Sequence, residues 1–211
     1  MKRFATIVFG FIGLVLVMAA CEDCEDCHVL FIGPFVKVDF RADSMLRESR
    51  RHLAVADTLL SQTVRELNEL LENEEDTLGF GSLIRTLTQE RDTIRTEVRN
   101  FEGGRVFLKE LRAEDGFFVP FYQDTLVNVF NLPLNMDADS SVFYFTFESL
   151  FLTVQDTLAV SYNRSIQSGF SRVNLIARNT QVLRHSFDSL ALRGCQSENC
   201  NSNDVIIQTF F

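Results

Sequence analysis

The stretch FVKVDFRADSMLRESRRHL, residues 35–53, changes its hydrophobic period part-way along. From Phe35 to Phe40, apolar and polar side chains alternate, which predicts a strand with one buried face. From Ser44 onward the apolar positions fall three, four or seven residues apart, the spacing of one helix face. A strand that passes directly into a long helix indicates an α+β fold.

Two helical segments bounded by glycines are expected between residues 44 and 103. ENEEDTLGFGS interrupts the apolar stripe and EGG ends it, so we expect an antiparallel helical hairpin, packed like a coiled coil. Because a hairpin with one narrow seam is marginal alone, it packs on the rest of the chain, self-associates or binds a partner helix. The stripe consists of Leu46, Leu53, Ala56, Leu60, Val64, Leu67 and Leu71, followed by Leu83, Leu87, Ile94, Val98 and Phe101.

Beyond Gly104 the period returns to two, in short apolar runs separated by turn residues. Runs of this kind at nearly regular intervals are typical of a β-sandwich. We therefore predict one antiparallel β-sandwich domain made of residues 29–43 and 104–211, with the helical hairpin, residues 44–103, inserted between its first and second strands.

Composition excludes one class of function. The chain has 211 residues and a formal net charge of −9, with 21 Phe and no Trp. Nucleic-acid binding requires a basic face, so we expect no nucleic-acid partner.

The N-terminus has the pattern of an export signal. Lys2 and Arg3 precede seventeen uncharged residues that end in Ala19 and Ala20, which predicts a removable signal peptide over residues 1–20. VMAAC resembles a bacterial lipobox, which is cleaved before a cysteine that then carries diacylglycerol and an N-acyl chain. The resemblance implies lipidation at Cys21, a Cys-rich tether over residues 21–28 and attachment to a membrane through the lipid. An uncleaved anchor and simple secretion are the alternatives.

Lipidation of Cys21 leaves an even number of cysteines, and in an oxidising compartment these favour disulfides. We favour at least one bond between an early and a late cysteine, because closing the longest loop restricts the unfolded chain most. Free thiols, a zinc site and haem attachment through the Cys-x-x-Cys-His motif at residues 24–28 are the alternatives, and we predict neither metal nor cofactor. The disulfide candidates are Cys24, Cys27, Cys195 and Cys200.

The β part resembles small lipoproteins of unknown function from Bacteroidota-type bacteria. The similarity lies in the Cys-rich start before FVKVDF, in LPLNMDADSSVFYFTF running into DTLAVSYNR, and in the apolar segment after NSND. It implies a β-sandwich on a lipid anchor in the cell envelope, at the outer membrane, without assigning an activity. EDCED after Cys21 resembles acidic tags that direct such proteins to the cell surface, and a solvated tether on a periplasm-facing protein is the alternative.

Asp-(Ser/Thr)-apolar triplets, which resemble the O-glycosylation acceptor of such bacteria, involve seven of the fourteen Asp residues. The alternative is structural, because Asp favours turns and the following residues start strands. The candidate acceptors are Ser44, Thr58, Thr77, Thr93, Thr125, Thr157 and Ser189.

No motif in the sequence predicts catalysis. His52 and His185 lack a nucleophile motif nearby, so we expect both to be surface histidines. Residues 135–139 begin like a calcium loop but lack its later Gly and Glu, which favours a turn. We therefore expect a non-enzymatic, lipid-anchored envelope protein with a structural or protein-interaction role. The alternative is a glycan- or peptide-binding module of an outer-membrane or surface assembly.

Overall fold

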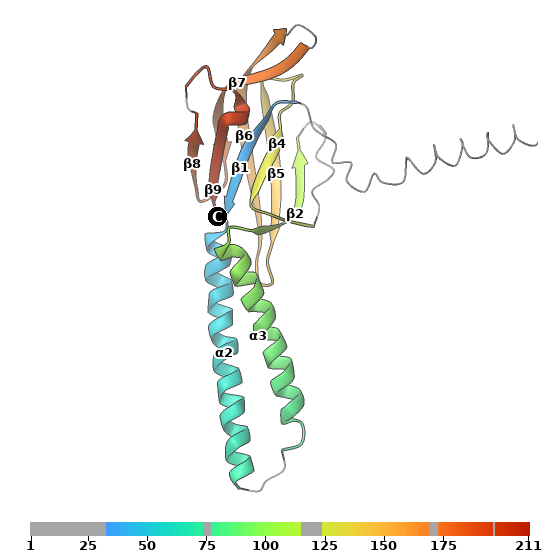
Figure 1. The fold of residues 1–211 in the computed structure, drawn as a ribbon, viewed down its shortest axis with the longest axis vertical. Helices are drawn as coiled ribbons and strands as arrows, with labels where there is room; N and C mark the ends of the chain where they lie inside the picture. The colour runs from blue at the N-terminus through green and yellow to red at the C-terminus, as the bar shows by residue number, and fades with distance from the viewer. Residues whose placement is uncertain (1–32, 74–76, 115–123, 169–172, 196) are drawn as a thin grey trace, which may run out of the picture. The chain divides into compact units, whose positions relative to one another are not determined.

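The computed structural model describes residues 33–73, 77–114, 124–168, 173–195 and 197–211. Every described element belongs to one unit, Gly33–Phe211. These elements are two α-helices and two β-sheets, a mixed α+β fold (Figure 1). Residues 29–32 of the predicted β domain and the apolar run at residues 117–122 lie outside the described residues.

The helical hairpin follows the first described strand, as the change of period predicts. In chain order the elements are β1 (Phe35–Arg41), α2 (Asp43–Glu72), α3 (Phe80–Glu102), β2 (Val106–Ala113), β3 (Thr125–Val127), β4 (Val129–Pro133), β5 (Ser140–Glu148), β6 (Thr153–Ser168), β7 (Val173–His185), β8 (Ser189–Gly194), a 3-10 turn η2 (Ser202–Asp204) and β9 (Val205–Phe210). Both helices therefore lie between β1 and β2, which confirms the predicted site of insertion.

The strands form two sheets, one ordered β4-β1-β9-β8 and the other β3-β2-β5-β6-β7. All pairs are antiparallel except β1 with β9, which run parallel. The expectation of a fully antiparallel architecture is therefore wrong for this pair. The reason is that β9 turns back along β8 and takes the inner position beside β1, so its direction is set by β8.

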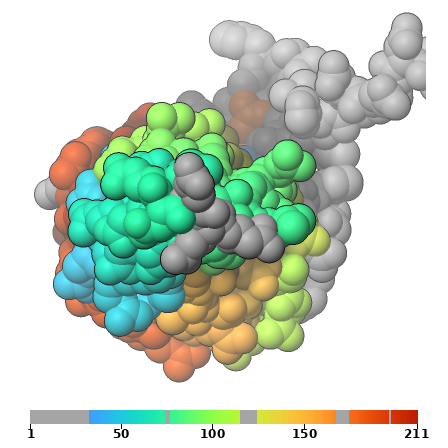
Figure 2. Space-filling model, turned by 90° about the horizontal axis from the view of Figure 1, so that it is seen from below, coloured from blue at the N-terminus to red at the C-terminus, as the bar shows by residue number. Residues whose placement is uncertain are grey.

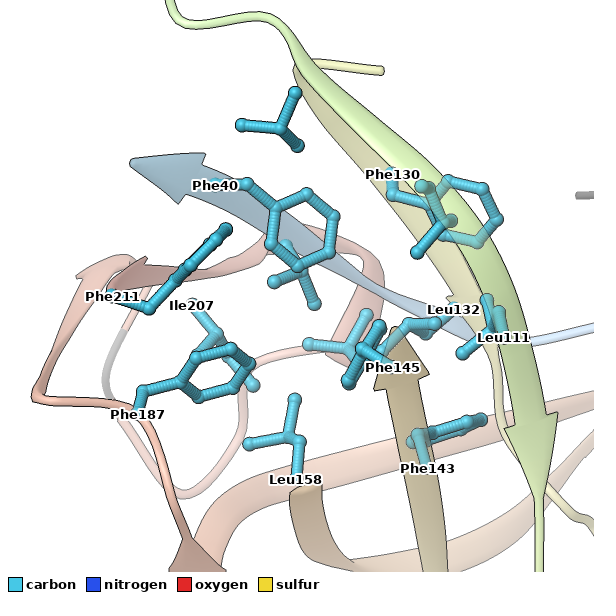
Figure 3. Close-up of a cluster of buried hydrophobic side chains, with 14 of the residues drawn as sticks. Phe40, Leu111, Phe130, Leu132, Phe143, Phe145, Leu158, Phe187, Ile207 and Phe211 are labelled. Carbon is cyan, nitrogen blue, oxygen red and sulfur yellow. The ribbon is translucent and has the colours of Figure 1, made fainter. Parts of the chain in front are cut away.

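Side chains from both sheets join one hydrophobic cluster (Figure 3). Alternation along β1 buries Val36, Val38 and Phe40, and the Phe40 ring lies 5.5 Å from that of Phe145 and 5.0 Å from that of Phe147 on β5. Burying one large apolar side chain contributes about 1.5–3 kcal/mol, so this cluster is the main source of stability for the strands.

Three of the expected β runs differ from the strands in the structure. The run from Thr125 to Leu134 crosses between sheets, because β3 pairs with β2 whereas β4, after the single residue Asn128, pairs with β1. Conversely, two runs around Asn179 form the single strand β7. Asn179 adopts a positive φ of 51°, which Asn tolerates better than most residues, and the β6–β7 ladder shifts register nearby rather than ending.

The seam between α2 and α3 differs in register from the predicted stripe. The least exposed positions alternate by four and three residues, a coiled-coil spacing, and include the buried Ser49 and Thr63. The predicted seam residues Val64, Leu71 and Leu83 are exposed at 39%, 57% and 47%. The seam positions are Ser49, Leu53, Ala56, Leu60, Thr63, Leu67 and Leu70 on α2, and Phe80, Ile84, Leu87, Arg91, Ile94, Val98 and Phe101 on α3.

Thr63 occupies the seam because its polar group is satisfied inside its own helix. The hydroxyl donates to the Leu59 carbonyl at 2.9 Å, so only the methyl group needs an apolar neighbour. At the far end, Gly79 caps α3 with a φ of 95°, which glycine adopts without strain. Its carbonyl accepts the backbone N–H groups of Ser82 and Leu83.

Candidate functional site

The base of the helical hairpin is held by Glu97 of α3. Its Oε2 accepts the Ser49 hydroxyl of α2 at 2.7 Å, and its Oε1 accepts the Leu150 backbone N–H at 2.7 Å. Leu150 belongs to the turn between β5 and β6, and this turn reaches the helices at their sheet end (Figure 1). One carboxylate thus joins both helices and the five-stranded sheet.

His52 belongs to the same contact. Its ring stacks on Phe151 of the β5–β6 turn, with centroids 3.8 Å apart and planes 8° from parallel. Its Nε2 lies 3.1 Å from Oε1 of Glu48, which Arg51 also contacts at 2.5 Å. The hydrogen bond from Arg51, assisted by His52, holds the pKa of Glu48 below its usual value. His52 therefore has satisfied partners at the surface, as predicted.

A groove of about 380 Å³ opens beside this junction, between α3 and the edge of the five-stranded sheet. Phe107, Leu126 and Leu150 contribute apolar surface to it. At its rim Glu148 pairs with Lys109 at 3.1 Å, and Lys109 also pairs with Asp124 at 3.3 Å. Glu148, followed by Asp124, raises the pKa of Lys109. The groove is suited to a peptide, because it offers an apolar surface for a side chain and a charged rim for the polar backbone.

Away from its base the hairpin runs clear of both sheets, and Figure 2 views it from its free end. On the side of the seam opposite Glu97, Arg50 pairs with Glu102 at 2.7 Å and Arg95 with Asp57 at 3.6 Å. These are exposed pairs of small energetic value. Several large apolar side chains remain exposed on this element. They are Val55, Leu59, Val64, Leu71, Leu78 and Leu83.

The two late cysteines pair with each other. Cys195 and Cys200 form a disulfide with Cα atoms 5.7 Å apart, so the expected bond between an early and a late cysteine is wrong. Gly194, at a φ of 80°, and the Cys195 N–H donated to the Asp204 carbonyl at 3.1 Å close the β8–β9 connection and bring both thiols together. Cys21, Cys24 and Cys27 lie outside the described residues.

The candidate glycosylation sites occupy different environments. Thr58 and Thr93 are exposed on the helices, where their hydroxyls donate to the Ala54 and Gln89 carbonyls at 2.8 and 2.9 Å. Ser189 is exposed on β8. Ser44, Thr77, Thr125 and Thr157 are half-buried. All seven remain predictions.

A buried carboxylate on β6 escaped the sequence reasoning, which treated Asp156 as part of a turn or an acceptor triplet. Asp156 is 6% exposed, its Oδ1 accepts the Ser186 hydroxyl at 2.8 Å, and its Oδ2 has no hydrogen-bond partner in the described part of the chain. Burial raises the pKa of Asp156, reinforced by Asp188 and opposed by Ser186 and His185. The available signal was its alternation with the buried Leu158 and Val160, which puts it on the core face.

Residues 135–139 form the predicted turn. The Asn135 side-chain oxygen accepts the Asp137 N–H at 2.9 Å, and the Asn135 carbonyl accepts the Tyr162 hydroxyl at 2.5 Å. Asp139 pairs with Arg164 at 2.7 Å. Across the described ranges no group of three His, Cys, Asp or Glu side chains could hold a metal ion. Likewise, none of the described helices is long and apolar enough to cross a membrane.

No family model, curated protein or solved structure matches this chain.

Proposed function

We propose that this protein is a non-enzymatic, lipid-anchored component of the bacterial cell envelope at the outer membrane, whose helical hairpin makes protein contacts. The anchor rests on the basic start, the uncharged segment and the small residues before Cys21. The resemblance of the β part to Bacteroidota-type lipoproteins supports the same location. The periplasmic and surface-exposed orientations both accommodate this role.

The β part is proposed to act as a rigid support. We infer that its two sheets pack face to face as a β-sandwich, because one hydrophobic cluster takes side chains from β1 and β9 of one sheet and from β2, β5 and β6 of the other. In such a sandwich the core is filled by side chains. The support then serves to hold the hairpin at a fixed orientation through Glu97 and the β5–β6 turn.

The observation that carries the protein-contact role is the surface of the hairpin beyond this junction. Leu71 is 57% exposed and Val55 is 53% exposed on a helix of 30 residues. Exposed apolar side chains along a paired helix are typical of surfaces that bind another helix. A partner protein and a second copy of this chain are the two forms of contact to be separated.

A photo-crosslinking amino acid at Leu71 tests the role in native cells, with the same group at Leu183 on β7, 60% exposed, as the matched control. We expect a discrete adduct from Leu71 and none of that size from Leu183. Light scattering of the purified chain then separates the two forms, because only self-association gives a dimer. Failure to form an adduct at Leu71, with a monomer at high concentration, refutes the contact role.

The groove beside α3 supports a second candidate, a peptide-binding module of an outer-membrane or surface assembly. Leu126 is 42% exposed within it and lies on β3, the edge strand of its sheet. An exposed edge can pair with an extended peptide. A crosslinker at Leu126 that yields an adduct while Leu71 yields none favours this candidate over the hairpin.

A further inference from the structure

The paired strands β6 and β7 extend beyond the rest of their sheet. β5 pairs with β6 only from Thr153 to Ser161, whereas the β6–β7 ladder continues to the pair of Ser168 with Val173. Six further residues of an antiparallel strand span about 20 Å. We call residues 163–168 and 173–178 the β6–β7 arm, and Figure 1 shows it at the end of the sheets opposite the helices.

The arm presents apolar side chains to the outside. Ile166 and Leu175 face each other directly across the ladder, which puts them on the same side of the arm. They are 69% and 49% exposed. A two-stranded ribbon buries little apolar surface by itself. Two exposed, branched apolar side chains at one point on it therefore indicate a contact surface.

The charge around the arm differs from that of the chain as a whole. The chain has a net charge of −9, yet the sequence from residue 163 to residue 178 contains three Arg and no Asp or Glu. Arg164 is paired with Asp139 at 2.7 Å, and no ion pair involves Arg178 among the described residues, although its Nε atom is buried. This positive segment complements an anionic surface.

The path of the chain brings the start of β1 to the same end of the sheets. The Leu134 N–H donates to the Pro34 carbonyl at 3.0 Å, and two residues later the Met136 carbonyl accepts Arg164 at 2.8 Å. The start of β1 and the base of the arm are therefore close. Only eleven residues lie between Cys21 and Gly33, so the length of the chain keeps a lipid on Cys21 within about 40 Å of Gly33.

From these observations we propose that the β6–β7 arm contacts the lipid surface, with Ile166 and Leu175 in the headgroup region of an anionic bilayer and the arginines beside its phosphates. The proximity argument rests on the proposed lipid anchor. The exposed apolar pair and the basic segment are independent of it. The contact orients the protein so that the helices point away from the membrane.

Single tryptophans test this contact cleanly, because the natural chain has none. The I166W and L175W variants of the lipidated protein are reconstituted in vesicles of phosphatidylglycerol and phosphatidylethanolamine that contain a brominated phospholipid. The matched control is L78W, at the far end of the helical hairpin, where the native Leu78 is 89% exposed. We expect blue-shifted emission with strong quenching for I166W and L175W, and unshifted, unquenched emission for L78W.

Three results would overturn the contact. Solvent-like emission from I166W and L175W in vesicles excludes the bilayer. A blue shift already present without lipid, and insensitive to bromine, indicates that another part of the same chain covers the arm. A blue shift that grows with protein concentration in the absence of lipid indicates a second copy.

The anchor is checked separately in the same preparation by the mass of the Cys21 peptide. If Cys21 carries no lipid, the proposed anchor fails, and the arm is then tested with residues 22–211, which contain every described element. For that chain we expect more protein to float with phosphatidylglycerol vesicles than with phosphatidylcholine vesicles, and less in high salt. Equal flotation with both, or flotation unchanged in I166S/L175S, contradicts the arm's contact with lipid.

Discussion

Glu97 of α3 accepts the backbone N–H of Leu150 at 2.7 Å, and this bond joins the helical hairpin to the turn between β5 and β6. The second oxygen of the same carboxylate accepts the Ser49 hydroxyl. This carboxylate, the stacking of His52 on Phe151 and the burial of Met45 and Phe101 in the hydrophobic cluster together hold the base of the hairpin against the sheets. A helical hairpin held in one direction loses less conformational freedom when it binds a partner.

Removal of this carboxylate is expected to loosen the base of the hairpin. Glu97→Ala leaves the Ser49 hydroxyl and the Leu150 N–H without their acceptor and lowers the free energy of unfolding by about 1–2 kcal/mol. Urea denaturation measures the loss. Glu90→Ala, an exposed position on the same helix, is the control and should change stability by less than about 0.5 kcal/mol. Equal effects of the two substitutions would contradict the proposed junction.

The register of the hairpin seam predicts unequal effects for two apolar truncations. Ile94 is 3% exposed and Leu83 is 47% exposed. Ile94→Ala should cost about 2–4 kcal/mol because it opens a cavity in the seam, whereas Leu83→Ala should cost less than about 1 kcal/mol. Thermal or urea unfolding distinguishes them. A larger loss of stability from Leu83→Ala than from Ile94→Ala would support the seam register predicted from the sequence.

Asp156 predicts a specific dependence on pH. Because its native pKa lies above the unfolded value of 3.8, protonation favours the folded state. This contribution is complete below the unfolded pKa and is lost as pH rises through the raised native pKa. Asp156→Asn, which keeps an oxygen for Ser186, should therefore unfold at higher denaturant concentration than the natural protein near neutral pH.

The advantage of Asp156→Asn should shrink as the pH falls towards the usual aspartate range. Unfolding curves across that range measure it, with Asp137→Asn at an exposed turn position as the control. A stability difference that stays constant with pH would mean that Asp156 does not titrate differently in the native state.

The local disulfide predicts a simple peptide map. No Lys or Arg follows Arg193, so trypsin releases Gly194–Phe211 with both Cys195 and Cys200 inside. Without reduction this peptide should be two hydrogens lighter than after reduction and linked to no other peptide. A cross-link to a peptide that contains Cys24 or Cys27 would restore the long-range pairing. Cys195→Ser with Cys200→Ser should cost about 2 kcal/mol, as expected for so short a loop.

Period and punctuation in the sequence were enough to predict the α+β class and the insertion of the hairpin. The alternation at Phe35–Phe40, the helical spacing after Ser44 and the glycines at 79 and 103–104 are local signals, and the structure follows them. The seam register was not predictable from hydrophobicity, because Ser49 and Thr63 are polar residues that find partners at Glu97 and Leu59. The seven-residue spacing of the seam, continued through polar positions, would have placed Ser49 and Thr63 in it.

Features that depend on long-range contacts escaped the sequence reasoning. Three of these features arise from the placement of distant strands. They are the crossing between sheets at Asn128, the parallel pairing of β1 with β9, and the burial of Asp156. The Cys195–Cys200 bond depends on Gly194 and the Asp204 carbonyl. Loop entropy alone favoured the longer loop, although native geometry decides which thiols can meet.

The most direct test of the central claim is the mass spectrum of the N-terminal peptide of the protein isolated from native outer membranes. A lipid-anchored protein predicts a peptide that begins at Cys21 and carries a diacylglycerol and an acyl chain, lost when Cys21 is replaced by Ser. A peptide that begins at Met1, or one in which Cys21 carries no lipid, would contradict the anchor and with it the assignment to the cell envelope.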